Sequence, residues 1–354
     1  GLKAGKIECL FTCSEETGMD GAFGLQPGFL TGKILLNLDS EDEGELFIGC
    51  SGGIDTTAEF KYTLQPLNKD LVAAKFSVSG GIGGHSGDDI HKGRANSVQL
   101  IARFLYAAFK EDDTIELCTI AGGNKRNAIA REASAVIAFN PDNEDKLIEL
   151  FNKFAAEIKD EYEITDPNIK ADAEPVTWKG DVIDRSTALR LIASLNAAPH
   201  GVLAMSAAIP GLVETSSNLA SVKMVEGNII RVGTNQRSSI KSASRYAAQR
   251  VEAAFAAVQA EVSHNGEYPG WKPKLDSHIL EVTRSSYLRL FGNEPIIRAI
   301  HAGLECGLFL DIYPDLDMIS FGPTIRGVHA PGEKLELSTV DKFCALLDDV
   351  IKNA

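Results

Sequence analysis

The sequence KILLNLDSEDEGE, residues 33–45, joins an unbroken apolar run to a group of acidic residues. A run of Ile and Leu without alternation is typical of a strand buried on both faces, which requires helices above and below its sheet. Asp39 then lies at the end of this strand, and α/β folds place their functional sites beyond strand ends. The segment therefore predicts an α/β fold with a functional site near Asp39.

Similar short apolar patterns, separated by glycine turns, lie on both sides of this strand. They predict strands at 7–12, 33–38 and 45–48, with a helix and a turn between the first two. The first strand would need neighbours, and the chain begins with Gly1 and not with Met. We therefore expect a segment upstream of Gly1 to complete this sheet.

Residues 57–264 have a different pattern. Hairpin-like alternation over 57–79, a helix, two strands and a second helix give a β-β-α-β-β-α order. A similar order follows, from a strand at 173–178 to a helix at 243–262, and it favours a structural duplication although the two parts do not match in sequence. Residues 265–270 are typical of a linker. We predict one domain formed by 1–56 and 265–354, with an inserted domain at 57–264.

Length and composition limit the class of protein. The 354 residues exceed what one hydrophobic core usually organises, which agrees with two domains. The formal charge of -14 argues against nucleic acid or an anionic membrane as partner, because phosphate binding needs clustered Lys and Arg. No apolar run approaches the length of a membrane span. The six cysteines lack a disulfide spacing, which is typical of a reducing cytoplasm.

The sequence CSEETGMDGA, residues 13–22, places two adjacent carboxylates at the end of the first predicted strand. Adjacent side chains in an extended segment point in different directions, so one can bind a metal ion while the other faces the attacking water. Taken alone, a Glu-Glu pair before a turn is more often part of a solvated loop. Glu15 and Glu16 become candidates only together with other motifs.

A further candidate loop is FGPTIRGVHAPGE, residues 321–333, which follows a predicted strand at 317–321 and contains His329. A Glu, an Asp and a His from three strand ends form a reasonable oxygen and nitrogen ligand set for zinc or manganese. Spacing alone does not establish such a site. The order of the short motifs along the chain adds the missing information.

Six short motifs occur in the same order as in the aminoacylase/carboxypeptidase-G metallopeptidases, and they most closely resemble those of the Xaa-His dipeptidases. They are EETGMDGA at 15–22, LLNLDSE at 35–41, GGHSG at 83–87, RNAI at 126–129, IHAGLECG at 300–307 and GPTIRGVH at 322–329. The resemblance covers nearly the whole chain. It implies a three-layer αβα catalytic domain with a mixed sheet, and an inserted α+β lid of ferredoxin-like halves.

The resemblance implies broad-specificity hydrolysis of dipeptides. Glu15 would be the general base that takes a proton from the attacking water and later protonates the leaving amine. Glu16 and His329 would ligate one Zn²⁺ and Asp39 a second, with Co²⁺ or Mn²⁺ as alternatives. Family members also carry an upstream His-x-Asp and a bridging Asp, which do not occur before Glu15 here, and we expect an upstream segment to supply them.

The sequence GGIGGHSG, residues 80–87, forms a glycine-rich bend in the predicted lid. A phosphate-binding loop is the obvious rival, but neither a following Gly-Lys-Ser/Thr nor a Rossmann spacing is present. Taken alone, His85 would be an ordinary turn residue. The resemblance implies instead that His85 donates a hydrogen bond to the tetrahedral oxyanion when the lid closes over the other domain.

Four further residues are implied to contact a small peptide substrate. Asn127 and Arg237 look like lid residues that hold its C-terminal carboxylate, which an Arg fork suits, although a lone lid arginine is more often a surface charge. His301 and Glu305 lie four residues apart in a helix predicted at 295–306. They would therefore share one helix face, and they either line the pocket or cap the sheet.

Alternatives to a dipeptidase stay open at this point. The same metals support an N-acyl amino acid deacylase or carboxypeptidase, and an incomplete metal site would leave an inactive relative or a non-catalytic binding protein. For the assembly we favour a homodimer. A lid of two halves can serve its own chain, whereas a lid of one half needs the histidine of a partner subunit.

Overall fold

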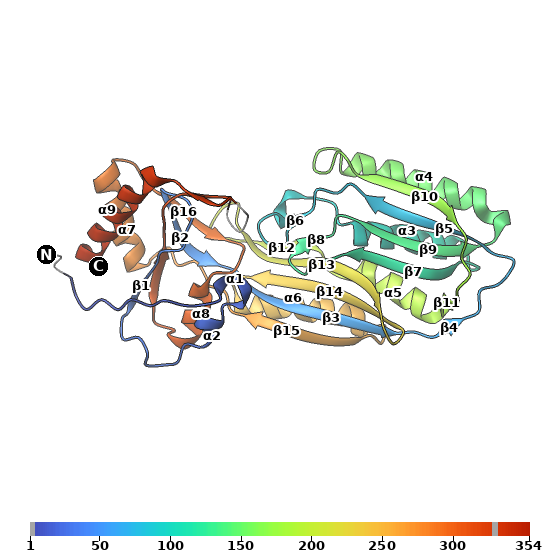
Figure 1. Cartoon of the computed structure of the whole chain (residues 1–354), viewed down its shortest axis with the longest axis horizontal. Coiled ribbons are helices and arrows are strands. Elements are labelled where there is room, and N and C mark those ends of the chain that lie inside the picture. The colour runs from blue at the N-terminus through green and yellow to red at the C-terminus, as the bar shows by residue number, and fades with distance from the viewer. Residues whose placement is uncertain (1–3, 328–331) are drawn as a thin grey trace.

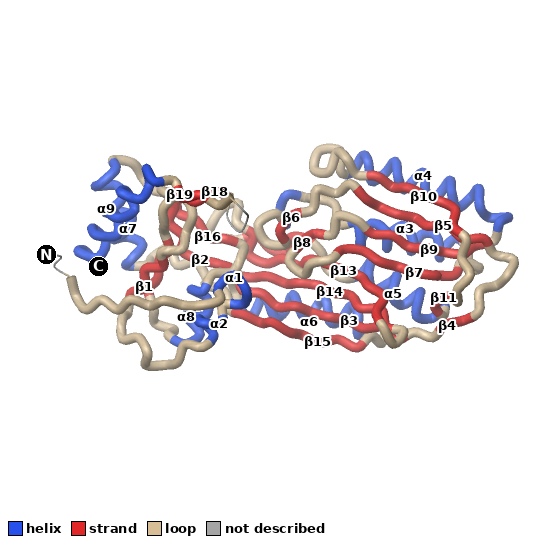
Figure 2. The backbone as a smooth tube through the Cα atoms, viewed as in Figure 1, coloured by secondary structure: helices blue, strands red, loops and turns tan. Residues whose placement is uncertain are grey.

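The computed structural model describes residues 4–327 and 332–354, without the side chains of residues 16 and 17. It contains two large β-sheets that lie end to end, each with its own hydrophobic core (Figures 1 and 2). The smaller sheet is formed by segments near both ends of the chain, and the larger one by the middle. The fold is therefore of the predicted α/β class with an α+β part inserted into it.

The smaller sheet has four strands in the order β1-β17-β2-β16. Their bounds are β1 Ile34–Asn37, β2 Glu45–Cys50, β16 Ile296–Ile300 and β17 Asp317–Ser320. β1 is parallel to β17 and β2 to β16, while β17 meets β2 antiparallel, so the sheet is mixed as expected. The accompanying helices are α1 Glu15–Gly18, α2 Asp20–Phe23, α7 His278–Phe291, α8 Glu305–Ile312 and α9 Leu337–Asn353. α7 packs on β17, β2 and α9, and α2 packs on α8.

The larger sheet has nine strands, ordered β10-β5-β9-β7-β13-β14-β3-β15, with β12 paired to β13. Their bounds are β3 Gly52–Lys61, β5 Val72–Ser79, β7 Glu116–Gly123, β9 Ala133–Phe139, β10 Lys170–Val176, β12 Gly201–Met205, β13 Val213–Val225, β14 Ile229–Ser238 and β15 Glu261–Tyr268. The helices α3 Ser97–Glu111, α4 Glu144–Glu161, α5 Arg185–Ala197 and α6 Lys241–Ala256 share one core on one face of this sheet (Figure 1).

The two halves of the larger sheet have the same topology. The first half consists of β5, α3, β7, β9, α4 and β10, with the strand order β10-β5-β9-β7. The second consists of β3, α5, β13, β14, α6 and β15, with the strand order β15-β3-β14-β13. In both halves the first strand lies between the fourth and the third, which is the ferredoxin-like arrangement. The shared order supports the expected duplication.

The second half does not begin where the sequence pattern placed it. The strand predicted at 173–178 is β10, which pairs with β5 and completes the first half. The second half begins with β3, which pairs with β14 and β15, so the hairpin predicted over 57–79 is wrong. β15 occupies the end of the helix predicted at 243–262 and most of the predicted linker. Alternation identifies strands, whereas their partners are decided by packing between distant segments.

Residues 7–12, predicted as a strand, pair with no strand in the described part of the chain. This segment is held by side chains instead, because the Glu8 carboxylate accepts the backbone N–H groups of Thr31 and Gly32 at 2.8 and 3.0 Å. A strand needs a neighbour that supplies backbone donors and acceptors. Apolar alternation in the sequence does not report whether such a neighbour is present, and the prediction is wrong for that reason.

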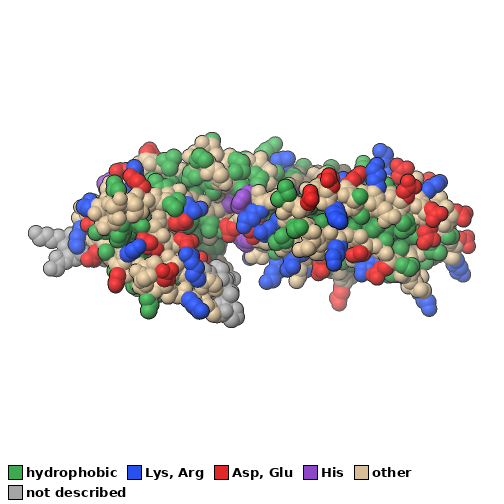
Figure 3. Space-filling model, turned by 90° about the horizontal axis from the view of Figure 1, so that it is seen from above, with side chains coloured by type: hydrophobic (Ala, Val, Ile, Leu, Met, Phe, Trp, Pro, Cys, Tyr) green, Lys and Arg blue, Asp and Glu red, His purple; other side chains and the backbone are tan. Residues whose placement is uncertain are grey.

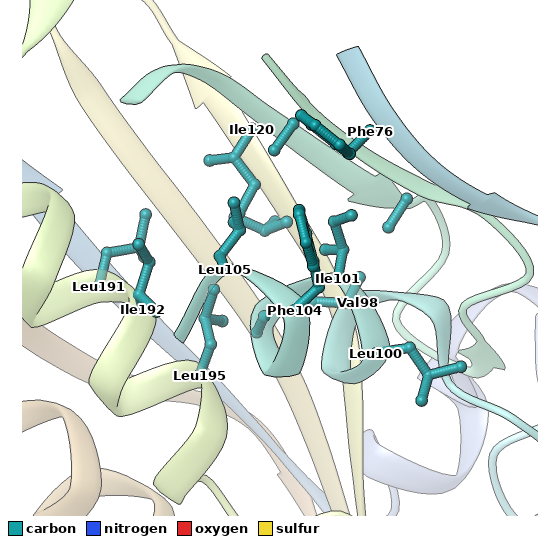
Figure 4. Packing of buried hydrophobic residues seen from close by; sticks show 14 of the residues in the cluster. Phe76, Val98, Leu100, Ile101, Phe104, Leu105, Ile120, Leu191, Ile192 and Leu195 are labelled. Atoms are coloured by element: carbon teal, nitrogen blue, oxygen red, sulfur yellow. The ribbon is translucent and has the colours of Figure 1, made fainter. Parts of the chain in front are cut away.

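The core of the inserted domain is built around α3. The Asn96 side chain caps this helix by accepting the backbone N–H groups of Val98 and Gln99. Phe104 of α3 packs against the rings of Phe76 and Phe151, with centroid distances of 4.8 and 4.9 Å, and α5 packs on the same helix (Figure 4). Burying each such side chain stabilises the fold by about 2 kcal/mol. The packing fixes the helices to one face of the sheet.

Short elements complete the described fold. They are β4 Leu64–Gln65 with β11 Val182–Ile183, β6 Gly84–His85 with β8 Ala128–Ile129, β18 Ile325–Arg326 with β19 Lys334–Leu335, and the 3-10 turns η1 Ile90–Lys92 and η2 Pro141–Asn143. The β6–β8 ribbon carries His85 and lies on the side of the inserted domain that faces the smaller sheet (Figure 1). Among the described helices, none combines the length and apolar character needed to cross a bilayer.

His200 makes the stability of the inserted domain dependent on pH. Its Nδ1 accepts the backbone N–H of Leu219 at 3.2 Å, and burial lowers its pKa to about 4. Since a histidine in the unfolded chain titrates near 6.5, the unfolded state takes up the proton first as the pH falls. We expect the free energy of unfolding to drop by about 1 kcal/mol between pH 7.5 and pH 5.5 through this residue.

The His200→Asn variant tests this expectation because its amide oxygen can accept the same N–H group without titrating. Urea unfolding of both proteins at the two pH values measures the effect. The variant should show a smaller loss of stability at pH 5.5 than the parent protein. An identical loss in both proteins would rule His200 out as the source.

Candidate active site

The narrow waist between the two sheets is formed by segments from both of them. Figure 3 shows histidine, acidic and basic side chains close together at this waist, where the surface is indented. Two groups of side chains lie here. The first surrounds the start of α8 on the side of the smaller sheet, and the second surrounds the β6–β8 ribbon of the inserted domain.

Glu305, the first residue of α8, is the centre of the first group. Thr12 Oγ1 donates to Glu305 Oε2 at 2.9 Å, whereas Glu305 Oε1 is buried without a hydrogen-bond partner. Burial raises the pKa of Glu305, the bond from Thr12 opposes this shift, and the charge of Asp39 adds to it. Two carboxylates that repel each other, one with an unpartnered oxygen, suit a divalent cation chemically.

Glu15 and Glu16 lie in α1, a single helical turn, and not in the extended segment that the sequence predicted. Ser14 before them has φ of 59°, so the chain turns sharply there and leaves the extended path. Because α1 packs on α2 and α2 packs on α8, the pair is brought toward Glu305.

Asp39 follows a tight junction between two strands. Asn37 of β1 is paired with Ser320 of β17, and the Ser320 hydroxyl donates to Asn37 Oδ1 at 2.7 Å. Beyond the strands, Gly322 approaches Ser40 so closely that any Cβ at 322 would collide with the Ser40 carbonyl. The segments that lead to Asp39 and toward 329 therefore leave the same edge of the sheet.

His329 lies outside the described residues, as does the side chain of Glu16. The convergence of Glu16, Asp39 and His329 therefore stays a prediction. Among the described side chains, no three His, Cys, Asp or Glu residues are grouped as metal ligands.

His85 is held in a turn at the end of β6. Its Nδ1 accepts the backbone N–H groups of Gly87 and Asp88 at 3.3 and 3.2 Å, so the neutral ring carries its proton on Nε2. The Asp88 carboxylate lies 3.3 Å from the same nitrogen. Burial works against ionisation of Asp88, but the protonated form of His85, which can donate from Nδ1 and carries a charge, lowers its pKa, as does the charge of Arg237. The turn thus fixes the tautomer and orientation of His85.

Arg237 is not the surface charge that a lone lid arginine usually is, since only 6% of it is exposed. Its Nε donates to Ser86 Oγ at 3.3 Å and its Nη1 to the Tyr268 hydroxyl at 2.9 Å. No carboxylate of the described residues forms an ion pair with this guanidinium. A buried cation without an anion is costly, so the position suits an anionic ligand. Asn127 is exposed, and its backbone carbonyl accepts the N–H of Ser86, the residue that also contacts Arg237, at 2.9 Å.

His301 joins the inserted domain to the smaller sheet. It is buried, and its Nε2 lies 2.8 Å from Ser216 Oγ of β13, whereas Nδ1 has no partner among the described residues. Burial, and then the charge of Arg237, lower the pKa of His301 to about 3, so the ring is neutral. A Cβ at Gly87 would collide with the His301 carbonyl, so only glycine lets the His85 turn rest on this residue.

The helix predicted at 295–306 is wrong. Residues Ile296–Ile300 form β16, which pairs with β2, and α8 begins only at Glu305. The β-branched run favours a strand once a neighbouring strand is present, and its apolar residues fit either period over so short a segment. His301 and Glu305 therefore do not share a helix face. They lie at the two ends of a short loop, His301 toward the inserted domain and Glu305 toward Asp39.

Sequence reasoning missed three residues of this region: Asp88, Ser216 and Tyr268. Asp88 carries a sequence signal, because it lies three residues after His85 in the same glycine-rich turn. Ser216 and Tyr268 carry none, because they reach His301 and Arg237 only through the sheet pairing of the folded chain.

The chain is similar to known proteins over nearly its whole length. Residues 76–166 match the family described as a peptidase dimerisation domain. The cytosol non-specific dipeptidase of Escherichia coli (strain K12) is 40% identical over 351 residues, which are 98% of this chain and 71% of that protein. The crystal structure of aminoacylhistidine dipeptidase from Vibrio alginolyticus is 42% identical, with a TM-score of 0.92, over 96% of this chain and 69% of that one.

Identity at this level, with the same fold across both sheets, confirms the fold class and the resemblance to Xaa-His dipeptidases. It also supports peptide-bond hydrolysis over the alternative of a non-catalytic scaffold. The chain therefore belongs to the dipeptidases of the aminoacylase/carboxypeptidase-G family of metallopeptidases, which hydrolyse peptide bonds.

Proposed function

We propose that this enzyme hydrolyses dipeptides with a free amine and a free carboxylate, and that Xaa-His dipeptides are among its substrates. The observation that carries the proposal is Arg237, a buried guanidinium at the waist with no carboxylate partner in the described part of the chain. A substrate carboxylate would neutralise it through charge-assisted hydrogen bonds. The substrate class agrees with the names of the two relatives, a non-specific dipeptidase and an aminoacylhistidine dipeptidase.

In this proposal Glu16, Asp39 and His329 hold divalent metal ions, two Zn²⁺ per site, with Co²⁺ or Mn²⁺ as alternatives. Such ions supply Lewis acidity for activating water and for polarising the scissile carbonyl. The family membership supports the use of divalent metal. The group around Glu305 adds chemical support, since its buried, unpartnered oxygen and the neighbouring Asp39 charge favour a cation close by.

Glu15 and His85 carry the proton transfer and the charge stabilisation. Glu15 takes a proton from the attacking water and delivers it to the leaving amine. His85 donates a hydrogen bond from its Nε2–H group to the oxyanion that forms on the carbonyl oxygen. The contacts of Nδ1 with the Gly87 and Asp88 backbone support this role, because they keep the proton on Nε2 in the neutral ring.

Substrate recognition falls to four residues. Arg237 binds the C-terminal carboxylate, and Asn127, next to the Ser86 turn, assists it. The neutral ring of His301 and the Glu305 carboxylate would contact the substrate between the two groups. A cationic group in the inserted domain and an anionic group near α8 would therefore match the two charged ends of a dipeptide.

The proposed assembly is a homodimer in the cytoplasm. Residues 1–56 with 265–354 would form the catalytic domain, and 57–264 a lid that also makes the dimer contact. The match of 76–166 to a peptidase dimerisation domain supports the dimer, and the name of the Escherichia coli relative supports the compartment.

Turnover of matched substrates tests the proposed function. We expect the full-length protein to hydrolyse Ala-His faster than N-acetyl-histidine by about a hundredfold or more, because a blocked amine leaves buried polar groups unpaired. A metal chelator should abolish turnover and Zn²⁺ should restore it. Faster hydrolysis of the N-acetyl amino acid would replace the proposal with a deacylase. Turnover that survives complete metal removal would contradict the metal site.

A further inference from the structure

Tyr268, the last residue of β15, places its hydroxyl beside the buried guanidinium of Arg237. Arg237 donates to this hydroxyl from Nη1 at 2.9 Å and to Ser86 Oγ from Nε at 3.3 Å. Both acceptors are neutral, so they orient the guanidinium without neutralising it. Asp88, the acid whose pKa is lowered in part by Arg237, makes its own contact with His85. The Nη2 group of Arg237 thus remains for a ligand.

The hydroxyl of Tyr268 can also donate a hydrogen bond. Because it accepts from Arg237, its own O–H must point to a different acceptor. Burial raises the pKa of Tyr268, while the charge of Arg237 works in the opposite direction, so the hydroxyl is protonated at neutral pH. No side chain or carbonyl of the described residues accepts this proton. Two neighbouring donors, one phenolic and one guanidinium, are therefore left for a pair of acceptor atoms.

Two glycines hold the ring of Tyr268 in place. A Cβ at Gly53 would lie 2.6 Å from its Cε1, and a Cβ at Gly303 would lie 3.0 Å from its Cε2. Gly53 belongs to β3 of the larger sheet, and Gly303 belongs to the loop between His301 and Glu305. The ring is thus packed between the two parts of the molecule. Its hydroxyl is fixed before a ligand arrives, which lowers the entropic cost of binding.

We infer that Tyr268 and Arg237 together bind the α-carboxylate of the peptide substrate. The phenol donates its O–H to one carboxylate oxygen, and the guanidinium donates from Nη2 to the other. This inference rests on the proposed function, which gives the carboxylate to Arg237, and it adds a second donor from the end of β15. A C-terminal carboxamide fits poorly, because its NH₂ group would face a donor.

Two matched substrates and a conservative variant test the role of Tyr268. In the full-length holoenzyme, Tyr268→Phe should lower kcat/KM for Ala-His about tenfold through a higher KM, because it removes a hydrogen bond to a charged group. For Ala-His carboxamide the same variant should change kcat/KM by less than about threefold. Tyr246→Phe, an exposed tyrosine on α6, is the matched control and should behave as the parent protein.

A second pair of variants separates direct binding from mere positioning of Arg237. If Tyr268 donates to the carboxylate itself, Tyr268→Phe should still raise KM for the free acid in an Arg237→Gln background. An effect that disappears in this background means that Tyr268 only orients Arg237, and it overturns the inference. An equal loss of kcat/KM in Tyr268→Phe for the free acid and for the carboxamide also overturns the inference.

Failure of the proposed function would look different. The parent protein would not prefer the free acid to the carboxamide, and Arg237→Gln would leave the ratio unchanged. The inference would then fall with the carboxylate site. If the parent and Arg237→Gln behave as expected but Tyr268→Phe matches the parent, only the inference about Tyr268 is overturned.

Discussion

Replacing Glu15 by Gln is expected to lower kcat for Ala-His by about 10²- to 10⁴-fold, the range attributed to a general base in position. Gln has the shape of Glu but accepts no proton at neutral pH, so the attacking water keeps its proton and the leaving amine receives none. KM should change little, because substrate binding is assigned to other residues. Steady-state kinetics on the full-length protein measure both constants.

Metal content and a surface control make the result specific to Glu15. Elemental analysis should find the same metal content in Glu15→Gln and the parent protein, since Glu16 and not Glu15 is the proposed ligand. Glu149→Gln, an exposed change on α4, should leave kcat unaltered. Loss of metal from Glu15→Gln would reassign this residue to metal binding. Activity within about tenfold of the parent would contradict a general base.

Replacing His85 by Ala is expected to lower kcat by about 10²- to 10³-fold, the cost of removing one donor to an oxyanion. KM should stay close to that of the parent, because the interaction forms only in the transition state. His85→Gln should recover part of the lost rate, since the Gln amide nitrogen can donate from near the position of Nε2. Steady-state kinetics of both variants with one dipeptide measure the loss of kcat and its partial recovery.

The His85 variants also need a control for the turn they occupy. Nδ1 accepts two backbone N–H groups, so His85→Ala removes a local support as well as a donor. His91→Ala, an exposed change in the following 3-10 turn, should leave kcat and thermal stability unchanged. Equal rates for His85→Ala and His85→Gln, with a lowered melting temperature in both, would show that the residue supports the turn and does not act on the substrate.

Elements that are defined locally were predicted well from the sequence. β9 is a mostly apolar run that is largely buried, and the sequence shows such a run directly. β1, predicted as buried on both faces, is only half-buried because it lies at the edge of its sheet. The amphipathic helix α4 has one apolar face, so its spacing identifies it. For β9 and α4 the burial pattern is itself the sequence pattern.

Pairing between distant segments could not be predicted in the same way. β3 alternates as any edge or central strand does, and nothing in it specifies β14 and β15 as neighbours. The same limit applies to the candidate site. The motif around His85 was evident, but the burial of Arg237 and its bond to Tyr268 depend on three strands and a turn meeting at the waist. The sequence therefore revealed the residue types of the candidate site but not the residues that contact them in the fold.

The structural units of this fold are inserted one within another along the sequence. The first ferredoxin-like half lies between β3, which ends at Lys61, and α5, which begins at Arg185, and both halves lie between β2 and β16. During synthesis the first ferredoxin-like half is complete before the last strands of the second half and of the smaller sheet have been made. Joining distant segments costs less entropy once the intervening chain is compact. Folding should therefore proceed from the inside outward, and a stalled chain would expose unpaired sheet edges that are prone to aggregation.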